Sequence, residues 1–311
     1  MSRMIVIGGA NIDICGSSLG SLRDYDSNPG TIEVSFGGVG RNIAENCALL
    51  GDKVDFVTVF ADDHYGRLLR QDCESLGMNT SYSTETSDYP SSMYLAILDH
   101  NHDMKIAMSD MRILRAFSDE MLDRVLKSVS NDDIIVIDAN LDLQCIHYIA
   151  QHATCRIAAD PVSTAKADRL ADILGYVTFF KPNRYEAKAM SGIEIDGEES
   201  ACMALDWYLE KGVREVLISL GEDGVLLAAG NEKFLYTHRQ IDVQNATGGG
   251  DCLLAAYVSE RRKGRTPRQA AQFAVAAAVT VIERQGMKRR EITRAMIEAN
   301  ALNTEIKEKQ L

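Results

Sequence analysis

The fold class of this 311-residue chain is decided by two short runs: Val177-Thr-Phe-Phe-Lys181 and Val216-Leu-Ile-Ser-Leu220. Both runs are dominated by apolar residues, which is the pattern of strands buried on both faces of a parallel sheet. The amphipathic stretch Glu199–Lys211 lies between them and predicts a helix that covers the sheet. Residues 177–220 therefore predict a strand–helix–strand unit.

The same alternation continues through the rest of the chain. Further apolar runs occupy Met4–Gly8, Val54–Phe60, Ile134–Asp138 and Ile157–Asp160, and further amphipathic stretches occupy Arg41–Leu50, Tyr65–Leu76, Asp119–Val129 and Arg268–Ile282. Repeated alternation of this kind predicts an α/β fold with a doubly wound, mostly parallel sheet flanked by helices. No internal repeat or low-complexity linker divides the chain, so we predict a single domain over residues 1–311.

Two segments depart from this alternation and predict a small separate sheet. Gly30–Gly37 and Ser91–Met108 alternate polar with apolar residues, and the second contains a polar turn at His100–Asp103. Such alternation indicates strands with one solvated face. We therefore predict a small β lid, formed by approximately residues 14–36 and 90–110, that projects from the main body. Its remaining apolar face would suit a subunit contact, and hence a homodimer.

Charge and hydropathy exclude several classes of protein. The chain has 45 Asp and Glu against 33 Lys and Arg, so its net charge is −12, and the absence of an extended basic block argues against nucleic-acid binding. The apolar runs are too short for a signal peptide or a membrane span. Seven cysteines without a Cys-x-x-Cys pair predict reduced thiols rather than disulfides or a zinc site. We expect a soluble, cytoplasmic protein.

A run of three glycines carries the strongest functional signal. Gly248, Gly249 and Gly250 precede Asp251 and an apolar, helix-forming run that reaches Tyr257. Bare backbone amides at a helix N-terminus attract anions, because they are unpaired and lie at the positive end of the helix dipole. The alternative is that Asp251 merely caps the helix, but a cap needs only one permissive residue. The glycine run therefore favours an anion site.

Three further motifs follow predicted strands or open helices. Gly37-Gly-Val-Gly-Arg-Asn42 opens an amphipathic helix, although glycines also suit an ordinary tight turn. Asn183 and Glu186 share a helix face and offer oxygen ligands for Mg²⁺ held partly through water, although the same spacing suits a capping box. Ser219-Leu-Gly221-Glu-Asp-Gly224 ends a strand, and its alternative is a simple hairpin. Ligands of open α/β sheets bind at the carboxyl ends of strands, where all of these motifs are predicted to lie.

These motifs together resemble those of the PfkB family, the ribokinase-like carbohydrate kinases, over essentially the whole chain. Gly37–Asn42 is similar to the first family signature and Asn245–Asp251 to the second. Gly9-Ala-Asn11-Ile-Asp13 resembles the sugar-binding strand end of the family. Asn183-x-x-Glu186 matches its magnesium-associated motif, and Ser219-x-Gly221-x-x-Gly224 matches its nucleotide-binding turn.

Within the family, three stretches are most similar to pseudouridine kinases: Asp26–Gly30, Gly37–Ala44 and Asp160–Lys166. The resemblance implies ATP-dependent phosphorylation of the 5′-hydroxyl of pseudouridine. The alternatives are a kinase for another nucleoside or for a free sugar such as ribose or fructose, and a non-catalytic sugar-sensing relative. The intact Asp251 and its glycine run argue against the non-catalytic relative.

The resemblance also implies roles for single residues, with ATP and Mg²⁺ as cofactors. Asp251 would be the general base that takes a proton from the substrate hydroxyl, and the amides at the glycine run would stabilise the transferring phosphoryl group. The implied catalytic residues are Asp251, Gly248, Gly249 and Gly250; the substrate would contact Asn11, Asp13, Gly38, Asn42, Lys166 and Asp251. ATP would contact Asn183, Ser219, Gly221, Gly224, Gly248 and Gly250, and the metal would be held by Asn183 and Glu186.

The chain departs from the family pattern just before the glycine run. Asn245 stands where relatives stimulated by a monovalent cation carry an aspartate that helps to bind potassium. The amide keeps an oxygen donor but lacks the negative charge, so the resemblance leaves a monovalent cation as an open question. Val39 stands where some ribose kinases carry lysine, which favours a different substrate.

Overall fold

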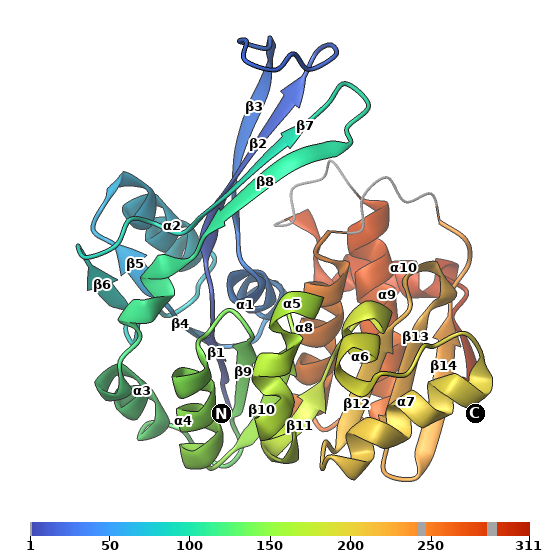
Figure 1. The fold of residues 1–311 in the computed structure, drawn as a ribbon. Coiled ribbons are helices and arrows are strands. Elements are labelled where there is room, and N and C mark those ends of the chain that lie inside the picture. The colour runs from blue at the N-terminus through green and yellow to red at the C-terminus, as the bar shows by residue number, and fades with distance from the viewer. Residues whose placement is uncertain (1, 242–246, 285–290) are drawn as a thin grey trace.

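The main body is built on one large sheet. A computed structural model describes residues 2–241, 247–284 and 291–311. The strands of this sheet are β1 (Met4–Ile7), β4 (Val54–Val57), β9 (Ile134–Asp138), β10 (Arg156–Asp160), β11 (Val177–Phe180), β12 (Glu215–Ser219), β13 (Val225–Ala229), β14 (Glu232–Thr237) and β15 (Lys307–Gln310). Within the described ranges the sheet has nine strands in the order β15-β14-β13-β12-β11-β10-β9-β1-β4 (Figure 1). The six strands from β12 to β4 pair in parallel, while β13, β14 and β15 pair antiparallel.

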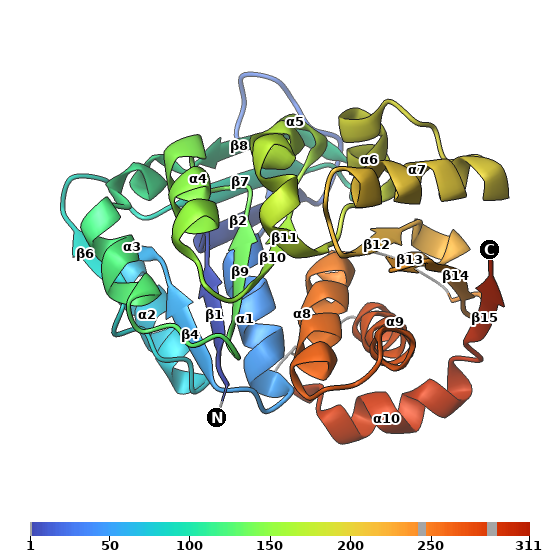
Figure 2. The same ribbon diagram turned by 90° about the horizontal axis from the view of Figure 1, so that it is seen from below.

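Helices cover both faces of this sheet (Figures 1 and 2). One side carries α1 (Val39–Leu49), α2 (His64–Ser75), α8 (Gly249–Arg262), α9 (Pro267–Glu283) and α10 (Arg294–Asn303). The other side carries α3 (Asp119–Leu126), α4 (Leu143–His152), α5 (Thr164–Ala167), α6 (Arg184–Ser191) and α7 (Glu198–Glu210). The predicted doubly wound, mostly parallel sheet is confirmed. In the described parts of the chain, no helix is long and apolar enough to cross a membrane.

The strand β1 illustrates why the predicted strands read as continuous apolar runs. Met4 and Val6 pack into the core under α1 and α8, whereas Ile5 and Ile7 pack into the core under α3 and α4. All four side chains are at most 1% exposed. Successive side chains of a strand point to opposite faces, so a strand covered on both faces needs an apolar residue at every position.

The prediction of one strand over Val54–Phe60 was wrong. This run divides into β4 and β5 (Val59–Ala61), and β5 pairs with β6 (Thr84–Thr86) in a two-stranded sheet. The break comes at the buried Thr58, whose amide donates to Ser83 Oγ at 3.0 Å instead of continuing the main sheet. A change of pairing partner leaves no trace in apolar periodicity, because both halves remain buried.

A second sheet projects from the carboxyl ends of the main strands (Figure 1). It contains β2 (Asn11–Ser18), β3 (Gly30–Gly37), β7 (Met93–Leu98) and β8 (Met104–Asp110) in the order β3-β2-β7-β8. The strands β3, β7 and β8 lie in the two segments predicted to form the small sheet. The predicted covered face is not found on β3 and β8, whose residues are mostly exposed on both faces. The strand β2, with its polar residues and glycine, was not predicted as a strand. The role of this sheet as a lid stays a prediction.

Candidate active site

The predicted site residues at the two glycine motifs meet between the starts of α1 and α8. Asn42 Nδ2 donates to Asp251 Oδ2 at 2.9 Å, although the two residues are 209 positions apart in sequence. Asn42 lies in the first turn of α1 and Asp251 in the first turn of α8. An amide N–H that donates to a carboxylate favours its ionised form, which is the form that can accept a proton.

The turn before α1 brings Gly38, Asn11 and Asp13 together. Gly38 has a φ of +98°, and a Cβ built on it would lie 2.5 Å from the Gly9 carbonyl oxygen and 2.9 Å from Asn11 Oδ1. Asn11 Nδ2 in turn donates to Asp13 Oδ1. A Cβ on Gly37 would overlap the Asp13 carboxylate. Only glycine lets the end of β3 approach β2 so closely, so these two glycines shape the surroundings of Asp13.

The carboxyl group of Asp13 titrates in an unusual range. Burial raises its pKa from 3.8 to about 6, while the Asn11 hydrogen bond and the positive charge of Arg41 oppose the shift. A carboxylate that is partly removed from water and directed toward a concave glycine turn is suited to accept hydrogen bonds from hydroxyl groups of a ligand.

The glycines at the start of α8 have separate structural reasons. Gly248 is the N-cap and has a φ of +82°, which favours glycine. Gly249 packs under α9, because a Cβ there would lie 2.8 Å from Ile282 Cδ1. A Cβ on Gly250 would lie 3.0 Å from the ammonium nitrogen of Lys181. The helix N-terminus thus has no side-chain cap among the described residues and lies directly against a cation.

Lys181 is a functional candidate that the sequence analysis missed. It follows β11, is 4% exposed, and its Nζ lies 3.1 Å from Asp160 Oδ2. Burial opposes its charge, but Asp160, Glu186 and Asp251 outweigh that effect and raise the pKa of Lys181. The sequence did contain a signal for Lys181, because it is a lysine at the end of an apolar strand. Lysine is rarely buried unless it is paired with a negative charge, and the carboxyl ends of such strands are where ligands bind.

The Asn183 and Glu186 pair forms the capping box that the sequence left open. Asn183 Oδ1 accepts from the amides of Tyr185 and Glu186, each at 2.9 Å, and Glu186 Oε2 accepts from the Asn183 amide at 2.8 Å. Burial raises the pKa of Glu186, against the influence of Lys181. The metal-binding role of this pair stays a prediction.

The charges around Lys181 fit a cation nearby. Three carboxylates, those of Asp160, Glu186 and Asp251, act on one ammonium, which leaves two formal negative charges in excess. Within the described residues, no group of three or more His, Cys, Asp or Glu side chains is arranged to hold a metal ion by itself. The side-chain oxygens of Asn183 and Glu186 therefore suit Mg²⁺ that keeps several waters and also binds substrate phosphate.

The predicted nucleotide turn lies next to Asn183. Ser219 pairs with Asn183 as an isolated parallel bridge, and its amide donates to the Pro182 carbonyl at 3.0 Å. Gly221 and Gly224 have φ values of +69° and +104°. The simple hairpin considered above is also present, since β12 and β13 pair across this turn. The bridge between Asn183 and Ser219 therefore places the end of β12 beside the start of α6.

Lys166 occupies a different part of the same end of the sheet. Its Nζ donates to Asn140 Oδ1 at 2.7 Å, and among the described residues it makes no hydrogen bond to Asp13 or Asn42. Burial lowers the pKa of Lys166, and the charge of Arg169 acts in the same direction. Asn140, two residues after the end of β9, was missed by the sequence analysis; its place just after a strand was the available signal. Asn245, where a monovalent cation was considered, lies outside the described residues.

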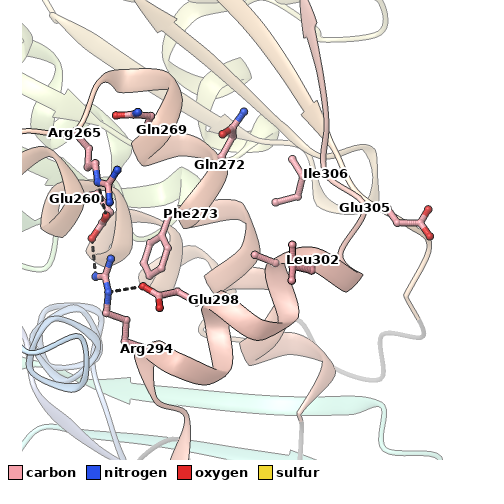
Figure 3. A pocket seen from close by; sticks show the side chains of 11 residues that line it. Glu260, Arg265, Gln269, Gln272, Phe273, Arg294, Glu298, Leu302, Glu305 and Ile306 are labelled. Atoms are coloured by element: carbon pink, nitrogen blue, oxygen red, sulfur yellow. Dashed lines mark hydrogen bonds and ion pairs between the residues drawn. The ribbon is translucent and has the colours of Figure 1, made fainter.

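A hollow of about 600 Å³ lies at the other end of α8 from Asp251 (Figure 3). Arg294 lies over the ring of Phe273, with 4.6 Å between the guanidinium carbon and the ring centroid, and pairs with Glu260 and Glu298. Glu260 also pairs with Arg265. Because its cations are paired with carboxylates, this hollow is poorly suited to a phosphate ligand.

Comparison with known proteins agrees with this geometry. A family model described as pfkB family carbohydrate kinase matches residues 1–293. The chain is 34% identical to a pseudouridine kinase of Escherichia coli (strain K12) over 258 residues, which are 82% of each protein.

Solved structures show the same fold. A ribokinase from Thermotoga maritima has a TM-score of 0.85 at 25% identity and covers 97% of this chain and 100% of its own. A carbohydrate kinase from Agrobacterium tumefaciens has a TM-score of 0.86 at 24% identity and covers 100% of both chains.

Proposed function

This chain belongs to the pfkB family of carbohydrate kinases, and we propose that it transfers a phosphoryl group from ATP to the 5′-hydroxyl of pseudouridine. As a family member it is an enzyme that phosphorylates a hydroxyl group of a small molecule. The choice of pseudouridine is supported by the 34% identity to the Escherichia coli pseudouridine kinase. The observation that carries the catalytic proposal is the hydrogen bond from Asn42 to Asp251 at the bare N-terminus of α8.

Asp251 is the general base of the proposed reaction. The substrate hydroxyl oxygen forms a bond to the γ-phosphorus, the bond from that phosphorus to the β,γ-bridging oxygen breaks, and ADP leaves. The hydroxyl proton passes to the Asp251 carboxylate. Asn42 supports this role, since its N–H donates to one carboxylate oxygen.

The N-terminus of α8 and Lys181 stabilise the charge of the transferring phosphoryl group. The amides after Gly248 point out of the helix start, and the ammonium of Lys181 lies beside Gly250. Donors that are already in place cost no reorganisation during the reaction. Asn183 and Glu186 would hold Mg²⁺ partly through water, and the metal would supply further positive charge to the phosphates.

The sugar and the base are recognised by different parts of the site. Asp13, Asn11 and Gly38 surround the turn where ribose hydroxyls would bind, and Asp13 supplies the charged acceptor. Lys166 in α5 and Asn140 just after β9 provide polar groups for the base. The four-stranded sheet of β2, β3, β7 and β8 would close over both as a lid.

The alternative within the family is a kinase for another nucleoside or for a free sugar, which the likeness to a ribokinase supports. A product-resolved screen decides between them. Pseudouridine, uridine, ribose and fructose are incubated with ATP and Mg²⁺, and the phosphorylated position is assigned by ¹H–³¹P NMR. Pseudouridine 5′-phosphate should be the main product. A higher kcat/KM for ribose or fructose would remove pseudouridine as the substrate.

We also propose that two copies associate through the apolar face of the projecting sheet. Ile32, Val34, Ile106 and Met108 share that face and are 75%, 54%, 58% and 66% exposed. Light scattering should report a dimer for the wild type and a monomer for Val34→Lys combined with Met108→Lys. Thr31→Lys places the same charge on the opposite face and should stay dimeric. A wild-type monomer at tens of micromolar would contradict this association.

A further inference from the structure

Arg41 is a buried cation next to the proposed catalytic pair. It lies in the first turn of α1, one residue before Asn42, and its side chain is 3% exposed. Nη2 lies 2.6 Å from Asp72 Oδ2 on α2, and Nη1 lies 3.3 Å from Glu45 Oε2 one turn further along α1. Burial opposes the charge, but Glu45 and Asp72 outweigh it and raise the pKa of Arg41. The guanidinium is therefore fixed in place and charged.

The same guanidinium also reaches into the site. Nη1 donates to the Phe36 carbonyl at 3.1 Å, at the end of β3, and to Asn42 Oδ1 at 3.4 Å. A guanidinium carries only donors, so the Asn42 amide must present its oxygen to Arg41. Its nitrogen is then left on the other side, where it donates to Asp251 Oδ2 at 2.9 Å. One chain of contacts thus runs from α2 through α1 to α8.

We propose that Arg41 is a positioning residue, which locks the Asn42 amide with its N–H toward Asp251 and anchors that orientation to α2 through Asp72. This inference rests on the proposed role of Asp251 as the general base. With Arg41 in place, Asn42 is a donor whether Asp251 is ionised or protonated. Without it, the amide can turn and accept a hydrogen bond from protonated Asp251, so that Asn42 then stabilises the neutral form as well as the ionised form.

The test compares Arg41→Lys with Arg262→Lys as a matched control. Lysine keeps the charge beside Asp72 but replaces the planar guanidinium by a single ammonium, which cannot hold all of the Arg41 contacts at once. Arg262 also pairs with a buried carboxylate, that of Asp52, but it lies in the last turn of α8, at the opposite end of that helix from Asp251.

Two readouts follow the ionisation of Asp251. The first is its carboxyl ¹³C chemical shift against pH, assigned by the signal lost in Asp251→Asn. The second is kcat against pH with whichever acceptor the wild type phosphorylates. Arg41→Lys should raise the apparent pKa by about one unit and lower the plateau kcat about tenfold, whereas Arg262→Lys should change neither. Lys181 is the charged group that acts on Asp251 from the end of β11. Lys181 and its partners Asp160 and Glu186 are unchanged in both variants.

The NMR titration needs no substrate, so it separates a failure of this inference from a failure of the proposed substrate. An unchanged Asp251 titration in folded Arg41→Lys would overturn the inference even if the enzyme phosphorylates pseudouridine. The upward shift would support it even if another sugar is the acceptor.

A double-mutant cycle separates positioning from a general loss of stability. If Arg41 acts through Asn42, Arg41→Lys should add no further shift in an Asn42→Ala background. Equal shifts in both backgrounds would overturn the inference. If Arg41→Lys does not fold, Asp72→Asn replaces it, because that change loosens the Nη2 anchor and leaves Arg41 in place. An upward shift of the Asp251 titration then supports the inference, and an unchanged titration overturns it.

Discussion

Replacing Asp13 by asparagine should stabilise the folded protein and at the same time remove most of its activity. Burial raises the pKa of Asp13 from 3.8 to about 6, which means that the folded protein disfavours the ionised form. The shift is about two pKa units, and at about 1.36 kcal/mol per unit it corresponds to about 3 kcal/mol. Because the side chain is partly exposed, solvent screening reduces this to about 1–2 kcal/mol.

The direction of the Asp13 pKa shift determines at which pH the two proteins differ in stability. Well below pH 3.8 Asp13 is protonated in both the folded and the unfolded chain, so its charge has no effect on stability. As the pH rises from 3.8 to 6, the unfolded chain releases the proton but the folded chain retains it, so the wild type loses stability relative to Asp13→Asn, in which residue 13 never ionises. Above pH 7 the difference should be constant.

Urea unfolding of both proteins at pH 4 and pH 7.5 measures this difference. Asp13→Asn should be more stable relative to wild type at pH 7.5 than at pH 4 by about 1–2 kcal/mol, because all other groups cancel in the comparison. Asp24→Asn, at an exposed position in the turn between β2 and β3, is the control and should show no such change. The kcat/KM of Asp13→Asn should fall about ten- to hundredfold, which corresponds to the free energy of one hydrogen bond to a charged group. An equal stability difference at both pH values would refute the reasoning.

Four further outcomes test the rest of the site. Asp251→Asn should keep the fold but lower kcat by roughly 10²–10⁴, the usual weight of general-base catalysis, and normal turnover would remove Asp251 from the mechanism. Lys181→Gln should lower kcat by about 10² or more, as loss of a preorganised charge-stabilising group does, and should also lower the melting temperature because Asp160 and Glu186 lose their partner. Glu186→Gln should raise the Mg²⁺ concentration needed for half-maximal activity, whereas an unchanged requirement would leave this residue with its capping role alone. The kcat/KM for pseudouridine should exceed that for uridine at least about tenfold, because an unpaired buried polar group penalises the wrong base, and equal values would contradict base recognition.

Local patterns predicted many elements accurately. Ile134–Asp138 is β9 and Gly30–Gly37 is β3, with the bounds read from the sequence. The strand β9 was found because it is buried on both faces and is therefore apolar at every position. The strand β3 was found because its polar and apolar residues alternate, although most of its residues are exposed on both faces. The hairpin over Ser91–Met108 was found for the same reason, as β7 and β8.

The strand β2 was not predicted, because its backbone pairing depends on distant segments. Asn11–Ser18 is held by β3 on one side and β7 on the other, as the partners Ile14 with Val34 and Ile14 with Leu95 show. A polar segment becomes a strand when two neighbours supply hydrogen bonds to its backbone, whatever its own propensity. The break between β4 and β5 has the same origin.

By itself the sequence determined the α/β class and the glycine run at the start of α8, because periodicity, turn residues and helix starts are encoded within a few positions. The roles of the candidate site residues came from the resemblance of the motifs to those of the PfkB family. Only the tertiary structure decided that Asn42 meets Asp251, that Lys181 is buried beside Gly250, and that Arg41 connects α2 to the site. These contacts join segments far apart in the chain, and the order of strands in the sheet brings their ends together. A side chain acquires its charge state and its partners from that packing, which no local stretch of residues contains.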